Sequence, residues 1–123
     1  MTEPAFRGHC LCGAVRFAAM GAPKWVAYCH CDSCRRHSGA PVTAYAGFAS
    51  AQVTWEGKPA VYESSPGVRR GFCGRCGSTL FFEGERWAGE THLHLGAFDD
   101  PAALVPDRHS FKEEKIPWLH LGA

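Results

Sequence analysis

The sequence lacks any long apolar run and any strong excess of one charge. Apolar stretches such as 79–82 and 93–95 are far too short to cross a bilayer, which excludes a membrane span. Thirteen basic and twelve acidic residues leave a formal net charge of +1, and this balance gives no overall attraction to a polyanion. We therefore expect neither membrane insertion nor a nucleic-acid partner.

Several further features are missing. Residues 1–20 show no basic start followed by an apolar run, so an export signal is not expected. No internal repeat or low-complexity tract appears, and the 14 glycines and 8 prolines are spread along the chain rather than gathered in a linker. We therefore expect a single domain over residues 1–123, large enough for an apolar core.

The chain also lacks helical periodicity, which no segment keeps for three turns. Short β-like runs separated by Gly and Pro predict a mostly β fold. Apolar and polar side chains alternate in three of these runs, at 14–18, 52–55 and 92–95, and each such strand should bury one face. The other expected strands are 24–28, 42–48, 60–63, 68–72 and 78–83. Single helical turns are expected after Cys31 and at 100–104, where Asp100 could cap and Pro101 suits the first helical position.

Cysteine is abundant by contrast, with seven in 123 residues. An odd number would leave one thiol unpaired in a secreted disulfide framework. The cysteines fall into three tight groups, whereas structural disulfides usually join cysteines distant in sequence. We therefore expect reduced thiols that bind metal in a cytoplasmic protein.

The two outer groups suit one structural metal site. Cys10 and Cys12 precede a glycine, and so do Cys73 and Cys76, so the chain can turn tightly and point backbone N–H groups at sulfur. Four thiolates complete a tetrahedral zinc shell. The alternatives are buried free thiols or a redox pair, although the Cys-x-x-Cys lacks the βαβ setting of a thioredoxin-like motif.

The middle group supplies three thiolates, from Cys29, Cys31 and Cys34, and no eighth cysteine remains to join them. Three protein ligands with a fourth position for water or substrate is the arrangement of a catalytic zinc, which would deprotonate an incoming thiol. The alternative is a closed Cys3His site. His37 has suitable spacing, and His9, His92 or His94 could approach through the fold, whereas His30 lies between two ligands and is expected to point away.

Five arginines lie near the cysteine groups and could offset the negative charge of the thiolate sites, namely Arg35, Arg36, Arg69, Arg70 and Arg75. Arg35 and Arg36, which directly follow Cys34, have a second potential use. Either guanidinium group could hold a substrate carboxylate through paired hydrogen bonds beside the metal. Charge compensation and anion recognition both remain open for this pair.

Three motifs together resemble the glutathione-dependent formaldehyde-activating enzyme and centromere protein V family. They are Gly8-His9-Cys10-Leu11-Cys12-Gly13, Cys29-His30-Cys31-Asp32-Ser33-Cys34-Arg35 with Ser38-Gly39-Ala40, and Phe72-Cys73-Gly74-Arg75-Cys76-Gly77-Ser78. The order and spacing of the groups carry the resemblance, which covers nearly the whole chain.

The resemblance implies a twisted, all-β "tent" fold with two zinc ions. It assigns Cys10, Cys12, Cys73 and Cys76 to a structural zinc and Cys29, Cys31 and Cys34 to a catalytic one. The family's activity implies a carbon–sulfur lyase of the S-(hydroxymethyl)glutathione synthase type, with a small thiol and an aldehyde as substrates. Another thiol or another small electrophile would fit the same pattern.

Two other function classes stay open at this point. A non-enzymatic zinc module would bind protein or nucleic acid through its β surface and should show a clustered basic face. A redox-responsive zinc protein would release its metal when the thiols are oxidised.

Overall fold

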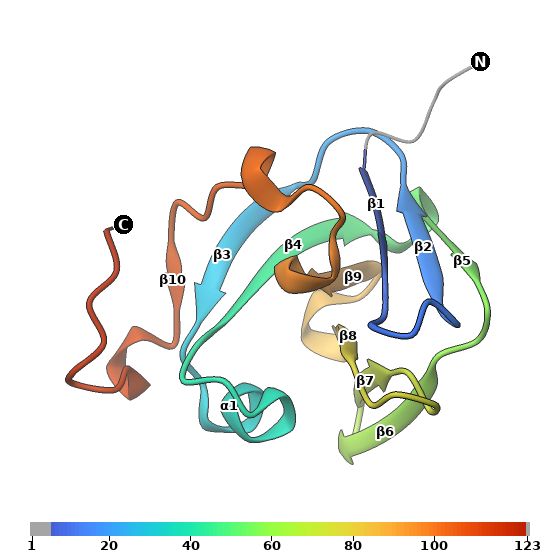
Figure 1. Ribbon diagram of the computed structural model, residues 1–123. Helices are drawn as coiled ribbons and strands as arrows, with labels where there is room; N and C mark the ends of the chain where they lie inside the picture. Colours follow the sequence, from blue (N-terminus) through green and yellow to red (C-terminus); the bar gives the residue numbers. More distant parts are fainter. Residues whose placement is uncertain (1–5, 123) are drawn as a thin grey trace.

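The computed structural model describes residues 6–122. Its strands form two antiparallel sheets, apart from one parallel pair, and the predicted mostly β fold class is confirmed (Figure 1). The smaller sheet has the order β1-β2-β5 and the larger one β10-β3-β4-β9-β8-β7-β6. The strands are β1 (Phe6–His9), β2 (Arg16–Ala19), β3 (Trp25–Cys29), β4 (Thr43–Ala49), β5 (Val53–Glu56), β6 (Ala60–Ser65), β7 (Val68–Phe72), β8 (Thr79–Gly84), β9 (Glu90–His94) and β10 (His109–Ser110).

Most predicted strands are present within a residue or two of their expected bounds. In the run at 14–18 the alternation holds, because Val15 and Phe17 are buried and Arg16 is exposed, although β2 itself begins only at Arg16. In β5 the half-buried Val53 and Trp55 alternate with the exposed Thr54 and Glu56. The expected strand list missed β1 and β10, which are four and two residues long.

The one-sided burial predicted for 92–95 is wrong. His92 and His94 are buried as fully as Leu93, because β9 lies inside the large sheet between β4 and β8 and is covered on both faces. Leu95 does not continue the strand but begins the 3-10 turn Leu95–Ala97. The two histidines alternate with leucine, so the sequence pattern predicted a half-exposed strand where the structure has a fully covered one.

Helical structure is sparse, as expected. The turn predicted after Cys31 is the helix α1 (Asp32–Ser38), which at seven residues is longer than the single turn expected. The second prediction is confirmed: the side chain of Asp100 accepts a hydrogen bond from Ala102 N, and Pro101 begins the 3-10 turn Pro101–Ala103. Within residues 6–122 no helix is long and apolar enough to span a bilayer.

One apolar core holds the two sheets together. Phe17 from β2 packs with Phe48 from β4, Leu80 from β8 and Leu93 from β9 in a single buried cluster. Phe98, which follows β9, packs edge-on against Phe17 with ring centroids 5.1 Å apart. The core therefore fixes the loop that follows β1 close to the loop between β7 and β8.

Candidate metal centres

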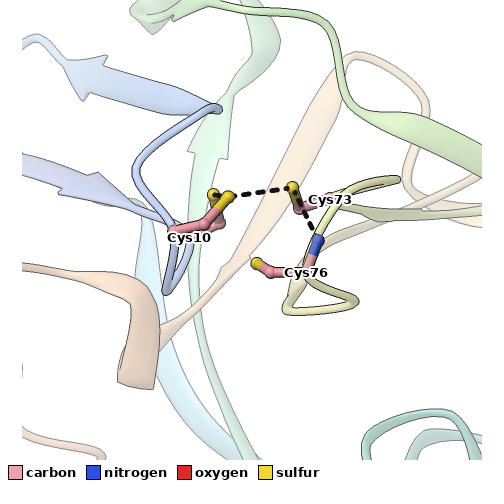
Figure 2. Close-up of side chains that lie close together, drawn as sticks. Cys10, Cys73 and Cys76 are labelled. Carbon is pink, nitrogen blue, oxygen red and sulfur yellow. Dashed lines mark hydrogen bonds between the residues drawn. The ribbon is translucent and has the colours of Figure 1, made fainter.

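Four cysteines meet where the two sheets approach each other. Cys10 and Cys12 lie on the loop between β1 and β2, while Cys73 and Cys76 lie on the loop between β7 and β8. Figure 2 shows Cys10 pointing across the gap between these loops toward Cys73 and Cys76. All four Sγ atoms lie within 4.8 Å of one another. The structure thus brings together the two outer cysteine groups.

The spacing of these sulfurs fits a zinc ion. A tetrahedral shell with Zn–S bonds of about 2.3 Å has sulfur-to-sulfur edges of about 3.8 Å. The Cys10–Cys12 and Cys12–Cys73 sulfur distances are 3.7 and 3.8 Å. These two distances match the edges of such a shell, so the four-cysteine cluster, which comprises Cys10, Cys12, Cys73 and Cys76, could hold a metal ion.

The loops around this cluster aim N–H groups at sulfur. Gly13 and Gly77 adopt φ of 81° and 83°, a left-handed conformation that glycine takes without steric cost. Val15 N donates to Cys10 Sγ at 3.3 Å, and Arg75 N donates to Cys73 Sγ at 3.3 Å. Such bonds stabilise thiolate, as a metal ligand requires.

Ser78 supports the same cluster from the far side of the β7–β8 loop. Its hydroxyl lies 3.1 Å from Cys76 Sγ and accepts a hydrogen bond from Leu11 N at 2.9 Å. Hydrogen bonding by Ser78 lowers the pKa of Cys76 to about 5. A single side chain therefore ties the two cysteine-bearing loops together and favours a thiolate at Cys76.

Three further cysteines meet at the junction of β3 and α1. Cys29 ends β3, Cys31 is the N-cap residue of α1, and Cys34 lies in its first turn. Cys34 N donates to Cys31 Sγ at 3.3 Å, so this sulfur takes the place of the Ser or Asp oxygen that usually caps a helix. The three Sγ atoms lie within 4.8 Å of one another, and Cys29 and Cys34 are 3.6 Å apart.

The environment of this three-cysteine cluster favours a thiolate at Cys34. Hydrogen bonds from Cys29 and Cys31 are the main cause that lowers the pKa of Cys34 well below its usual value, and Arg70 and Tyr45 lower it further. The pKa of Cys29 is raised, mainly because its thiol is hydrogen-bonded to Cys31 and Cys34. A negative charge is thus favoured at the most buried end of the cluster.

Two residues contact Cys34 directly: Tyr45, which the sequence analysis missed, and Arg70, one of the arginines expected to offset the charge of the thiolates. Tyr45 on β4 donates its hydroxyl to Cys34 Sγ at 3.3 Å, and Arg70 on β7 donates from Nη1 at 3.5 Å. Arg70 is buried, donates from Nε to Ser64 Oγ at 3.0 Å, and lies over the ring of Phe82. A buried guanidinium group beside a thiolate offsets its charge at short range.

Arg35 and Arg36 lie elsewhere. Both guanidinium groups pair with Asp32, in each case at 2.9 Å, and of the two arginines Arg35 is half-buried and Arg36 exposed. Neither residue lines the cavity beside the three-cysteine cluster. Their role in anion recognition stays a prediction.

The histidines proposed as a fourth ligand have other neighbours. His9 pairs with Asp99, His92 with Glu90, and His94 packs against the ring of Tyr45. His37 lies edge-on to Phe72. Among residues 6–122 no histidine nitrogen shares the 4.8 Å cluster of Cys29, Cys31 and Cys34.

His30, which was expected to point away from the metal, contacts another strand. Its Nε2 lies 2.8 Å from Nδ1 of His109 on β10, and the two rings stack. His30 is fully buried, and burial is the main cause that lowers its pKa. The pair therefore attaches the short parallel strand β10 to the end of β3.

A cavity of about 630 Å³ opens beside the three-cysteine cluster. Cys29, Cys31 and Cys34 all line it, together with Tyr45 and Arg70. This volume lies within the range of about 300–1,000 Å³ that is typical of small-molecule sites. A ligand in the cavity would reach the sulfurs, so the cluster could take part in chemistry as well as in folding.

Comparison with known proteins adds a family and a fold. The sequence model of a family described as "Glutathione-dependent formaldehyde-activating enzyme" matches residues 5–114. The "Putative glutathione-dependent formaldehyde-activating enzyme" of Halomonas elongata is 32% identical over 125 residues, covering 93% of this chain and 79% of that protein. An "Uncharacterized lyase" of Schizosaccharomyces pombe is 33% identical over 79 residues, covering 64% of this chain. That alignment spans only 58% of the yeast protein.

A solved structure supports the fold. The crystal structure of a Rhodobacter sphaeroides protein superposes with a TM-score of 0.67 over 85% of this chain and 99% of that one. Sequence identity is 20%, so this likeness concerns the arrangement of the strands.

Proposed function

The chain belongs to the glutathione-dependent formaldehyde-activating enzyme family, and from this premise we propose that it joins a thiol to a small aldehyde beside Cys29, Cys31 and Cys34. The observation that carries the proposal is the convergence of these three sulfurs on a cavity of ligand size. Glutathione or a similar small thiol and formaldehyde or a related electrophile are the proposed substrates.

The reaction is an addition. The thiol sulfur forms a bond to the carbonyl carbon, the π electron pair of the carbonyl moves to its oxygen, and the proton of the thiol ends on that oxygen. A zinc ion held by the three cysteine sulfurs would supply the positive charge that lowers the pKa of a bound thiol and keeps it nucleophilic at neutral pH. The reverse reaction breaks the carbon–sulfur bond, as expected of a lyase.

The chain's own side chains would set the charge of this site. Three thiolates around a divalent ion leave one net negative charge, and the Arg70 guanidinium lies against Cys34 to offset it. Tyr45 donates its hydroxyl to the same sulfur, which orients Cys34 and reduces its basicity. The aromatic side chains around the cavity would limit the access of water, so that the thiol meets the aldehyde rather than solvent.

The four-cysteine cluster has a structural role in this proposal. Its ligands come in pairs from loops that belong to different sheets, and all four would be used by the metal. A closed shell of four thiolates is the usual form of a structural zinc site. We therefore propose two zinc ions in each chain, one structural and one catalytic.

Cobalt substitution tests the proposal. Sulfur-to-cobalt absorption should intensify when glutathione adds a fourth thiolate to the shell of Cys29, Cys31 and Cys34. Arg35→Ala or Arg36→Ala should weaken this effect without changing the metal content if either residue recognises the carboxylates of the thiol. A cobalt spectrum that saturating glutathione leaves untouched would make glutathione-dependent chemistry at this site untenable.

A further inference from the structure

The cavity beside the three-cysteine cluster is more aromatic than formaldehyde requires. Its volume of about 630 Å³ must admit the thiol as well as the aldehyde, but formaldehyde, with two non-hydrogen atoms, would make little use of the aromatic walls. Several aromatic rings line the cavity, among them Trp25, Phe82, Trp87 and Phe111, which come from different parts of the chain. Aromatic walls of this kind bind flat apolar groups by stacking and by edge-on contact.

From these walls we infer that the aldehyde substrate carries a flat, uncharged ring. The inference rests on the proposed function and names the class of electrophile for it. Three of these rings also pack against the buried cluster of Cys29, Cys34 and Tyr45, namely those of Trp25, Phe82 and Phe111. A ring held between them would keep its aldehyde carbon near the three-cysteine cluster, where the thiol would attack it.

Trp25 is held in place from two sides. Its Nε1 donates to Glu90 Oε1 at 3.3 Å, and its indole lies flat across Gly47, its partner on β4. A Cβ atom at position 47 would overlap the indole. Glycine at this position therefore lets the ring form a fixed wall of the cavity, and a rigid wall costs less ordering free energy when a ligand binds.

Phe111 supplies an independent indication. Among residues 6–122 it is the one residue other than glycine with positive φ, at 55°. Bulky side chains rarely adopt this left-handed conformation, and residues held in it cluster at ligand and active sites. The same segment is anchored by Glu114, whose Oε1 accepts a hydrogen bond from Asp32 N at 2.8 Å.

The charges around the cavity favour an uncharged ring over a highly charged substrate. Arg70 donates hydrogen bonds to Cys34 and Ser64, and the guanidinium group of Arg86 lies over the ring of Trp87. The acidic side chains of Asp32, Glu85 and Glu114 also line the space. A charged group on the aldehyde would meet these carboxylates, whereas a neutral ring on it would displace water from apolar walls.

Binding of benzyl alcohol tests the ring site without any reaction, because this probe has the ring but no carbonyl carbon. Calorimetry should show saturable binding to the zinc-loaded protein. Trp87→Ala should weaken that binding about tenfold, which corresponds to about 1.4 kcal/mol, and Phe111→Leu, which keeps an apolar side chain but removes the ring, should weaken it several-fold. Tyr62→Ala removes an exposed aromatic ring on β6 outside the cavity and should bind as the wild type does.

Turnover then separates the inference from the proposed function. With glutathione as the thiol and the uncatalysed rate subtracted, kcat/KM for benzaldehyde should exceed that for formaldehyde, and Trp87→Ala should lower this ratio about tenfold. Circular dichroism and metal content must match the wild type; if Trp87→Ala fails to fold, Phe111→Leu carries the test.

Two other results have clear meanings. Turnover of formaldehyde with no preference for benzaldehyde and no saturable binding of benzyl alcohol would overturn the inferred substrate class and leave the proposed function standing. Turnover of neither aldehyde, with benzyl alcohol still bound and the binding lost in Trp87→Ala, would overturn the proposed function but support the ring-binding site.

Discussion

Replacement of Arg70 by methionine should loosen metal binding at the three-cysteine cluster alone. Arg70 is buried and donates to Cys34 Sγ at 3.5 Å, so Arg70→Met removes a positive charge and one donor while keeping a long apolar side chain. A hydrogen bond to a charged group is worth about 1.5–3 kcal/mol. At this long distance we take the lower value, which corresponds to roughly tenfold in metal affinity.

Zinc release to a chromogenic chelator measures the effect. The wild-type protein should release its two ions in two phases, because a closed four-thiolate shell gives up its ion more slowly than a three-thiolate shell. Arg70→Met should speed the fast phase about tenfold, within the range of 10–100-fold seen when a partner of a metal ligand is removed. The slow phase should not change, because Arg70 contacts neither Cys10 nor Cys73 in any described interaction.

Arg69→Met is the matched control. Arg69 precedes Arg70 on β7, is largely exposed, and pairs with Glu83 at 3.2 Å. Exposed ion pairs contribute about 0–1 kcal/mol, so both phases should keep the wild-type rate. If Arg70→Met also released zinc at the wild-type rate, or if it accelerated both phases equally, its contact with Cys34 would have no specific role in metal binding.

Three further predictions concern the metals and the buried histidines. Cys73→Ala should unfold the protein, because a structural zinc contributes about 10–16 kcal/mol, comparable with the whole stability of a typical domain. Cys31→Ala should stay folded and keep one ion. Circular dichroism and metal analysis check both variants, and equal loss of the fold in the two would contradict this division of roles. His37→Ala should keep the zinc stoichiometry of the wild type, whereas loss of one ion from the folded variant would indicate a Cys3His site. Burial lowers the pKa of His94 to about 4. Between about pH 6.5 and pH 4, this histidine therefore takes up a proton only in the unfolded chain. The free energy of unfolding should fall over this range by up to about 3 kcal/mol. His94→Gln should flatten this part of the curve of unfolding free energy against pH, and an unchanged curve would show that other groups cause it.

The fold class was predictable because the chain has strand-length apolar runs, frequent turns and no helical period. The error at β9 has a physical cause. The hydrogen bond to Glu90 satisfies the buried ring of His92, and the ring of His94 packs against Tyr45. Sequence patterns treat histidine as a residue for the exposed face, but a strand covered on both sides can bury it where its own strand or a neighbouring one supplies a partner, as Glu90 of β9 does for His92 and Tyr45 of β4 does for His94.

The grouping of the cysteines was predictable from spacing, because ligands one to three residues apart must converge locally. Arg70 was expected among several arginines that offset the thiolate charge, but its contact with Cys34 and that of Tyr45 were not predictable, because the two residues are 36 and 11 residues away from Cys34 in sequence. One signal was present in the Arg69-Arg70 pair on a predicted strand. Adjacent residues on a strand point to opposite faces, so if one arginine faces solvent, the other must face the interior and needs a negative partner there.

The two cysteine clusters differ in what they connect, and this difference supports a division of roles. Cys10 and Cys73 lie on loops of separate sheets, so an ion between them closes a long stretch of chain and opposes unfolding of the whole molecule. Cys29 and Cys34 are five residues apart on one strand and the helix that follows it. An ion there orders little additional chain, so the charge, the buried arginine and the aromatic cavity gathered around it are better explained by binding and chemistry than by stability.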